Sequence, residues 1–301
     1  MNKSQQMVVI TNRPKIEAEL KNQTWTGWEE IAQAIADQIA DLQQRHLKST
    51  VKIALDGYVG TDWSIVVENV QQAFSEKDIN PLFLDIETCL KSPEVLEQQF
   101  EPYLGDDAVF GKLYKKNLKT LFDPQKLSSL KRSATNKNSI VYGTGASLAL
   151  KRDDWSLVFY FDLTREESLK RNKQWMSQTG TQSISPKKLY YIDFQVNDRH
   201  RRQWISKIDL YVDGNDAQQP VMISSDLFKN ATAELASSPF ALKYLYEPGP
   251  WGGQWLKKVR NLPKDWVNCA WSYEVIAQEQ SLLVELKQGT VMDIPWTTFL
   301  D

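Results

Sequence analysis

The chain has 301 residues, and at about 150 residues per domain this length predicts two domains, each with its own core. Apolar residues make up 42% of the sequence and charged residues 25%, so extended disorder and fibrous repeats are excluded. With 36 Lys and Arg against 38 Asp and Glu, the net charge is -2, which argues against nucleic acid or an anionic membrane surface as a partner.

The cysteine and histidine content further limits the class of protein and the kinds of metal or redox site to expect. Cys89 and Cys269 match neither a zinc nor a redox spacing, so we interpret both as reduced core thiols of a cytoplasmic protein. His46 and His200 are the two histidines, and we expect no metal site in this chain. No apolar run reaches the roughly 18 residues that a membrane helix needs.

Residues 1–50 are predicted to form a strand and an amphipathic helix. Met7 to Thr11 is a short apolar stretch typical of a strand. Thr26 and Glu29 have the Thr-x-x-Glu spacing of a capping box, and apolar residues follow at helical intervals. His46 lies near the end of that helix, where a cation suits the helix dipole.

Residues 51–238 alternate short apolar runs with helical stretches. A second capping box, Thr164 to Glu167, opens one of the helices. Uninterrupted apolar strands between helices are typical of a parallel sheet covered on both faces, so we predict an α/β fold with a doubly wound, mostly parallel sheet. The expected strands are Val51–Leu55, Pro81–Ile86, Ser139–Tyr142, Leu157–Phe161 and Ile208–Val212.

Residues 239–301 differ from the preceding segment in composition and in the pattern of apolar residues. Glu247 to Gly253 is rich in Pro and Gly, and the short segments 270–276, 281–286 and 290–294 suit antiparallel strands. About 60 residues are few for a closed β-domain. We therefore expect an open strand edge, through which the chain could associate with a partner.

The segment after the first α/β strand has the arrangement of a phosphate-binding loop. Gly57 and Ser64 match the first glycine and the hydroxyl of the Gly-x-x-x-x-Gly-Lys-Ser/Thr motif, and Gly60 and Thr61 lie between them. Asp62 and Trp63 stand where the motif has its second glycine and its lysine. Two readings remain open: a phosphate site that uses Gly57, Gly60, Thr61 and Ser64, or a tight structural turn.

Arginines that could hold a phosphate gather in two places. Arg165 and Arg171 lie on the helix that follows Thr164, and Arg199 and Arg201 flank His200. A solvated charged surface is the alternative interpretation. Asp85, at the end of the second α/β strand, and His200 are the two candidate catalytic residues.

Two segments near the C-terminus resemble a known family. Residues 239–255, with Pro250, Trp251, Gly252 and Gly253, and residues 268–276 resemble the start of class I mannose-6-phosphate isomerases (phosphomannose isomerases). Upstream, residues 53–63, 140–146 and 197–202 look like the P-loop-kinase-like domain that precedes the isomerase domain in bacterial fusion members.

The resemblance implies a zinc-dependent cupin that interconverts mannose 6-phosphate and fructose 6-phosphate, with zinc on a glutamine, two histidines and a glutamate. No histidine follows His200, and the sequence ends before the region where those ligands are expected. The resemblance therefore implies a partial cupin in residues 239–301, with zinc expected only in the complete family enzyme.

Three functions follow as hypotheses, and whether the chain is an enzyme stays open. We favour the N-terminal portion of a mannose-6-phosphate isomerase-like protein that binds a phosphorylated small molecule without turning it over. The second hypothesis is a small-molecule kinase or nucleotide-binding enzyme that uses a Mg-nucleotide. The third is a non-catalytic module for regulation or assembly.

Overall fold

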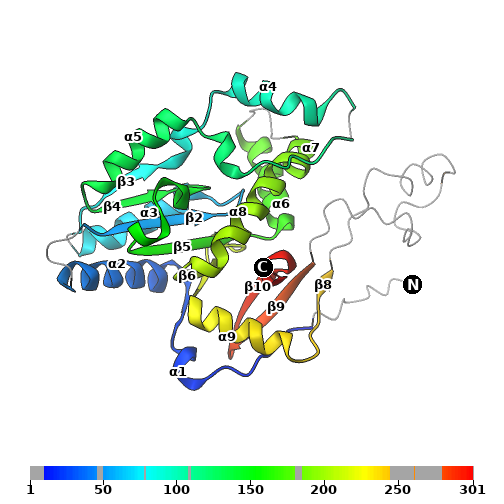
Figure 1. Cartoon of the computed structure of the whole chain (residues 1–301). Coiled ribbons are helices and arrows are strands. Elements are labelled where there is room, and N and C mark those ends of the chain that lie inside the picture. The colour runs from blue at the N-terminus through cyan, green and yellow to red at the C-terminus, as the bar shows by residue number, and fades with distance from the viewer. Residues whose placement is uncertain are drawn as a thin grey trace.

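The computed structural model describes residues 10–45, 50–77, 79–107, 110–179, 185–244, 261 and 280–300. A seven-stranded sheet in the order β1-β7-β6-β5-β2-β4-β3 forms its centre (Figure 1). The strands of this sheet are β1 (Thr24–Thr26), β2 (Lys52–Gly57), β3 (Leu82–Asp85), β4 (Ser139–Tyr142), β5 (Leu157–Asp162), β6 (Leu210–Asp213) and β7 (Val221–Ser224).

Five neighbouring strands of the sheet, β3-β4-β2-β5-β6, run parallel, and β7 and β1 are antiparallel additions at one edge. The predicted α/β fold with a mostly parallel central sheet is therefore confirmed. All five parallel strands lie where the apolar runs predicted them, to within two residues at each end. The two antiparallel strands, β1 and β7, were not predicted.

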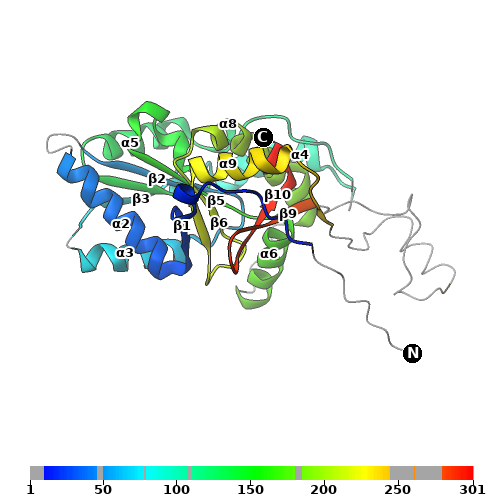
Figure 2. The ribbon, with the colours of Figure 1, turned by 90° about the horizontal axis from the view of Figure 1, so that it is seen from below.

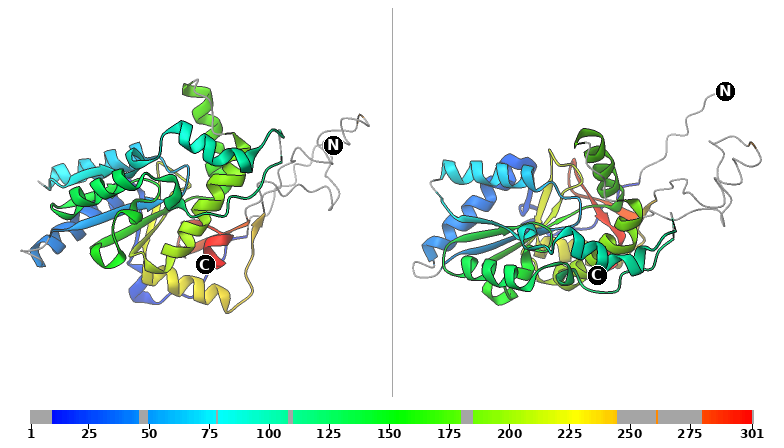
Figure 3. Two further views of the ribbon diagram at one scale, coloured as in Figure 1. Left: turned by 45° about the horizontal axis from the view of Figure 1, so that its top comes forward. Right: turned by 90° about the horizontal axis from the view of Figure 1, so that it is seen from above.

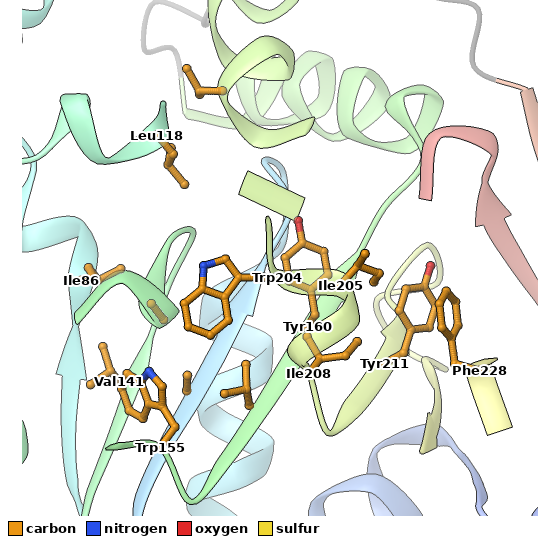
Figure 4. Packing of buried hydrophobic residues seen from close by; sticks show 14 of the residues in the cluster. Ile86, Leu118, Val141, Trp155, Tyr160, Trp204, Ile205, Ile208, Tyr211 and Phe228 are labelled. Carbon is orange, nitrogen blue, oxygen red and sulfur yellow. The ribbon is translucent and has the colours of Figure 1, made fainter. Parts of the chain in front are cut away.

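Helices cover both faces of the sheet. One face packs against α2 (Gly27–Arg45) and α3 (Trp63–Glu76), which lie side by side (Figure 2). The other face packs against a larger set of helices, which surrounds Tyr160, Tyr211 and Trp204 (Figure 4). The helices with residues in this second cluster are α4 (Pro93–Leu104), α5 (Pro124–Thr135), α8 (Phe194–Trp204) and α9 (Ser225–Ala236).

The remaining elements are short or connect the layers. Helix α6 (Arg165–Thr179) follows β5, and a π-helical turn (Leu189–Asp193) runs directly into α8. The short helices are α1 (Ala18–Lys21), α7 (Pro186–Lys188) and α11 (Trp296–Leu300), with 3-10 turns at Ile86–Cys89, Leu118–Leu121, Ala146–Ala149, Arg152–Asp154 and Ile205–Lys207.

A second, antiparallel sheet has the order β10-β9-β8. Its strands are β8 (Lys243–Tyr244), β9 (Gln280–Lys287) and β10 (Thr290–Pro295), and it lies at the β6 side of the large sheet, away from β3 (Figure 3). Leu282 and Met292 belong to the same buried cluster as Tyr211, so the two sheets share a core. The strands expected at 281–286 and 290–294 are confirmed as antiparallel, whereas a cupin remains a prediction for residues 239–301.

The predicted boundary at residue 50 divides elements that the structure joins. Strand β1 pairs with β7, and Ile31, Ile35 and Ile39 of α2 are buried against the large sheet. The predicted capping box is wrong in detail: a carboxylate oxygen of Glu30, rather than of Glu29, accepts the backbone N–H of Thr26 at 2.7 Å, and the Thr26 hydroxyl has no partner among the described atoms. At Thr164 half of the predicted box forms: its hydroxyl accepts the N–H of Glu167 at 3.2 Å, but its own N–H donates to the side chain of Asn215 at 2.9 Å rather than to Glu167.

Candidate functional site

The carboxyl edge of the large sheet, where the five parallel strands end, is the candidate functional site. Open α/β sheets bind ligands at this edge, at the point where the strand order changes direction. Here the chain leaves β2 for β3 and returns beside β2 as β4, and β5 then lies on the other side of β2. The loop of residues 58–62 follows β2 and leads into α3, so it lies at that point of change.

Asp62 caps the helix that follows this loop. Its Oδ1 accepts the N–H groups of Ser64 and Ile65 at 3.2 and 3.3 Å and the Ser64 hydroxyl at 2.5 Å. In a phosphate-binding loop, the free N–H groups at such a helix start would face the phosphate. Two of these groups and the predicted phosphate ligand Ser64 are therefore bonded to a carboxylate of the chain itself.

Helix α6 holds the loop from outside. The Ser168 hydroxyl donates to the Val59 carbonyl at 2.7 Å, and Arg171 donates to the Gly60 carbonyl at 3.2 Å. Gly60 has φ +98° and its missing Cβ would lie 2.9 Å from the Ser168 Oγ, so a side chain there would force the loop off α6. The cavity that Thr61, Asp62 and Arg171 help to line measures only about 10 Å³, room for one water at most.

Asp56, at the end of β2, is the centre of a buried polar cluster. Its oxygens accept the N–H groups of Gly57 and Gly145 at 2.7 Å, the N–H of Ser147 at 3.0 Å and the Ser147 hydroxyl. The Nε2 of His200 lies 2.7 Å from Oδ2 of Asp56. Burial alone raises the pKa of Asp56, but the charge of His200 and these hydrogen bonds outweigh it, so the pKa lies below its usual value.

This cluster contains Ser, His and Asp but lacks the geometry of a nucleophilic triad. A triad needs the histidine to bridge the hydroxyl and the carboxylate through its two ring nitrogens. Here the same nitrogen of His200 faces Asp56 at 2.7 Å and the Ser147 Oγ at 3.3 Å, and that Oγ also bonds to Asp56. All three residues are at most 2% exposed, so the arrangement locks β2 to α8.

A second buried cluster closes the ends of β5 and β6. Arg201 is fully buried and donates to Asp162 at 3.0 Å and to Asp198 at 3.3 Å. Burial alone lowers the pKa of Arg201, but Asp162 and the other acidic neighbours outweigh it and raise the pKa well above its usual value. Helix α11 completes this cluster, because Thr297 bonds to Arg201 and the Thr298 hydroxyl donates to Asp162 at 2.5 Å.

The antiparallel sheet joins the carboxyl edge through Asp213, the last residue of β6. Its oxygens accept the N–H of Asp293 at 2.7 Å and the N–H of Asn215 at 3.0 Å, and the Asn215 side chain donates to the Asp293 carbonyl at 3.1 Å. Burial is the main cause that raises the pKa of Asp213 to about 7. At Asp293, the outer edge of β10 is thus covered by the α/β part rather than open.

The four predicted phosphate arginines all bind groups of the chain itself. Arg165 pairs with Asp198, Arg171 pairs with Glu167 at 2.9 Å and donates to three carbonyls, and Arg201 pairs with Asp162 and Asp198. Arg199 lies apart from these three, because it donates to the carbonyls of Tyr114 and Lys116. Their phosphate-binding role stays a prediction.

The two candidate catalytic residues lie in separate surroundings. His200 belongs to the Asp56 cluster, whereas Asp85 caps the short helix after β3 by accepting the N–H of Glu87 at 2.8 Å. Burial, and then the charge of Asp85, raises the pKa of Glu87. No group of His, Cys, Asp and Glu side chains in the described residues could hold a metal ion. Pro250, Trp251, Gly252, Gly253, Cys269 and His46 lie outside those residues.

Sequence reasoning missed the residues that occupy the edge. Asp62 was considered only as a replacement for the second glycine of the phosphate-loop motif, although an aspartate directly before an apolar helical segment is a common N-cap. Ser147, Tyr58 and the two α11 threonines gave no local signal. Tyr58 donates to Asp198 at 2.7 Å and lies under the Arg201 guanidinium, a contact made across 140 residues.

The described residues form an α/β domain with a mostly parallel sheet, and at the carboxyl edge of this sheet the charged side chains bond mainly to groups of the chain itself. A family model described as a domain of unknown function, DUF8485, matches residues 27–237, and the chain belongs to that family. A search of curated proteins finds no match. No described helix is long and apolar enough to cross a membrane.

Among solved structures, the chain is similar to one titled as a "putative fructose transport system kinase" from Silicibacter sp. TM1040. The sequences are 11% identical, and the match covers 56% of this chain and 94% of that chain with a TM-score of 0.42. We draw neither fold nor activity from a likeness of that size.

Proposed function

We propose that this chain is a non-catalytic α/β module, with a degenerate phosphate loop, that acts in regulation or assembly by binding. The observation that carries the proposal is the Asp62 carboxylate on the first N–H groups of α3 and on Ser64. An anionic phosphate would have to displace that carboxylate and would meet its charge. The small cavity beside the loop supports the same interpretation.

The cations around the loop support the proposal independently. Phosphoryl transfer depends on positioning and on neutralising the phosphate charge, normally with a lysine or arginine and Mg²⁺. In this chain Trp63 replaces the lysine and packs edge-on against Phe161, with ring centroids 5.7 Å apart. Arg165, Arg171 and Arg201 already neutralise acidic side chains, so releasing them for a nucleotide would leave those carboxylates without their partners.

The other two hypotheses remain proposals on weaker support. The isomerase-like role with a phosphorylated sugar rests on the resemblance at residues 250–253 and 268–276, which lie outside the described residues. The Mg-nucleotide kinase hypothesis rests on the strand, loop and helix around Gly57. The contacts of Asp62 and Arg171 within that loop favour the non-catalytic module instead. A cytoplasmic location likewise stays a prediction.

Calorimetric titration with Mg-ATP and then with mannose 6-phosphate tests the proposal. The wild-type chain should give no binding heat with either. The double variant Asp62→Gly/Trp63→Lys restores the full Gly-x-x-x-x-Gly-Lys-Ser pattern at residues 57–64 and should gain Mg-ATP binding. Asp123→Gly is the matched control, because Asp123 caps α5 through the N–H groups of Gln125 and Lys126.

Two results would overturn the proposal. The first is micromolar Mg-ATP binding by the wild-type chain that Arg171→Ala abolishes, because it would show that the loop holds phosphate with Asp62 in place. The second is phosphate release or transfer by the wild-type chain in a turnover assay. Heat with mannose 6-phosphate alone would instead favour the isomerase-like role.

A further inference from the structure

The outer surface of α2 and α3 contains a groove that the carboxyl edge does not use. It measures about 740 Å³ and is lined by residues of both helices. The two helices lie side by side (Figure 2). Trp28 and Asp37 are nine positions apart on the helix, and at about 1.5 Å per residue this gives the groove a length of about 14 Å. Its lining residues are Trp25, Trp28, Glu29, Glu30, Ala32, Gln33, Ala34, Asp37, Asn69, Gln72, Ala73 and Glu76.

The groove has a single sign of charge. Glu29, Glu30, Asp37 and Glu76 line it, and the described lining includes no Lys, Arg or His. One cation lies beside it, because Lys77 pairs with Asp37. Clefts lined by one sign of charge concentrate ions of the opposite sign, so this groove favours a cationic occupant and disfavours nucleic acid or a phosphorylated ligand.

Two half-buried indole rings form one end of the groove. Trp28 is held in place because its Nε1 donates to the Ala217 carbonyl at 2.8 Å and its ring stacks on Phe161 at 6.3 Å between centroids. Trp25 is held by the pairing of β1 with β7. A lysine or arginine side chain over an indole face gains a cation–π interaction in addition to the attraction of the carboxylates.

Part of the groove is lined by small residues. Ala32, Ala34 and Ala73 are buried and contribute no long side chain that could fill the space between the helices. An incoming apolar side chain could therefore reach them while neighbouring cationic side chains meet the carboxylates. A length of about 14 Å fits two to three turns of a helix or about four extended residues, so a peptide matches it better than a single ion.

We propose that the α2–α3 groove docks a lysine- or arginine-rich peptide segment of a partner protein. This inference rests on the proposal that the chain acts by binding, and it supplies the chemistry of the partner. Charge complementarity carries the choice of occupant, and the aromatic end of the groove, formed by Trp25 and Trp28, is the position for one cationic side chain.

Fluorescence anisotropy with defined peptides tests the docking. The probe is a labelled 15-residue peptide of five Lys-Ala-Leu repeats, compared with five Glu-Ala-Leu repeats. The wild-type chain should bind the lysine peptide with a dissociation constant below about 100 μM at low salt, should lose at least tenfold at high salt, and should not bind the glutamate peptide.

A matched pair of triple variants locates the binding. Glu29→Gln/Asp37→Asn/Glu76→Gln removes three groove carboxylates and should weaken binding at least tenfold. Glu97→Gln/Glu101→Gln/Asp106→Asn makes the same change in net charge on and just after α4, at exposed positions away from the groove, and should weaken it less than twofold. Circular dichroism melting confirms that both variants are folded.

A second measurement reads the aromatic end directly. The indole N–H signals of Trp25 and Trp28, assigned from Trp→Phe variants, should shift on titration with the lysine peptide. Equal weakening in both triple variants, undisturbed indole signals or no binding by the wild type would each overturn the docking proposal. None of these results bears on nucleotide binding by the loop, so the two proposals can fail separately.

Discussion

The carboxyl edge of the large sheet and the α2–α3 groove both gather charged side chains, but in opposite environments. At the edge, Arg201 and Asp162 are buried together, and Arg165 and Arg171 also pair with carboxylates of the chain. In the groove, Glu29 and Asp37 face solvent, and Glu29 has no ion-pair partner among the described residues. Buried charges need internal partners, whereas exposed charges are stabilised by water and stay available.

This difference separates a region used for folding from one available for binding. The edge connects segments that are far apart in sequence, since Arg201 of α8 meets Asp162 of β5 and Thr297 of α11. The groove is lined by neighbouring elements, mainly α2 and α3, whose apolar sides already pack against the sheet. Charge substitutions should therefore be costly at the edge and nearly neutral in the groove, which the following predictions test.

The largest effect is expected for Arg201→Ala. The substitution leaves the Asp162 carboxylate buried without its cation, and removing one partner of a buried pair typically costs about 3–5 kcal/mol. Urea unfolding measures the loss. Arg202→Ala, one residue along and exposed, should cost less than about 1 kcal/mol. Adding Asp162→Asn to Arg201→Ala should recover part of the loss; a loss below 1 kcal/mol for Arg201→Ala would contradict the closed-edge interpretation.

The pH dependence at Asp213 comes next. Burial raises its pKa from 3.8 to about 7, so between these pH values the folded chain keeps a proton that the unfolded chain has released. Its contribution to stability is thus fully present below about pH 4, falls as the pH rises to about 7 and is lost above it. Relative to Asp213→Asn, the wild-type unfolding free energy should fall by up to about 4 kcal/mol over that range.

Urea unfolding of the two proteins at each pH unit from 4 to 8 gives this difference. Asp56 has a lowered pKa and contributes with the opposite sign, but it is present in both proteins and cancels. The groups that face Asp213 are Asp293 and Asn215, and Lys243 pairs with Asp293 at 2.9 Å. A difference that stays constant with pH would show that Asp213 is ionised throughout.

A moderate effect is expected for Asp62→Ala. Loss of an N-cap costs about 1 kcal/mol, because the first N–H groups of the helix lose their acceptor. Asp123→Ala in α5 removes the same kind of cap and should cost a similar amount. Thermal unfolding checks both, and the two losses should add in the double variant. A loss well above that of Asp123→Ala would mean that Asp62 does more than cap α3.

The parallel strands could be predicted because their signal is local. Ser139 to Tyr142 is a run of residues buried on both faces, and the structure gives β4 the same bounds. Strands β1 and β7 are only three and four residues long, and their pairing depends on each other rather than on their own composition. The α/β fold was therefore predictable, and the antiparallel edge was not.

The closed edge was only partly predictable, because its partners come from distant segments. The glycines, serine and arginines of the candidate site were recognised by residue type and spacing. Their partners were not, since nothing local to Asp162 indicates that Thr298 will bond to it across 136 residues. Spacing identified which residues carry charge but not which of those charges are already neutralised.

The smallest effect is expected for Glu29→Gln/Asp37→Asn/Glu76→Gln in the groove. These side chains are exposed, and the pair of Asp37 with Lys77 is of the surface kind, worth at most about 1 kcal/mol. The unfolding free energy should therefore change by less than about 1 kcal/mol, and relief of repulsion between the carboxylates could even raise it. Urea unfolding of this triple variant and of Arg201→Ala under the same conditions compares the unfolding free energies lost in the two regions. A loss as large as that of Arg201→Ala would mean that the groove acids serve folding, and the contrast between the two regions would then disappear.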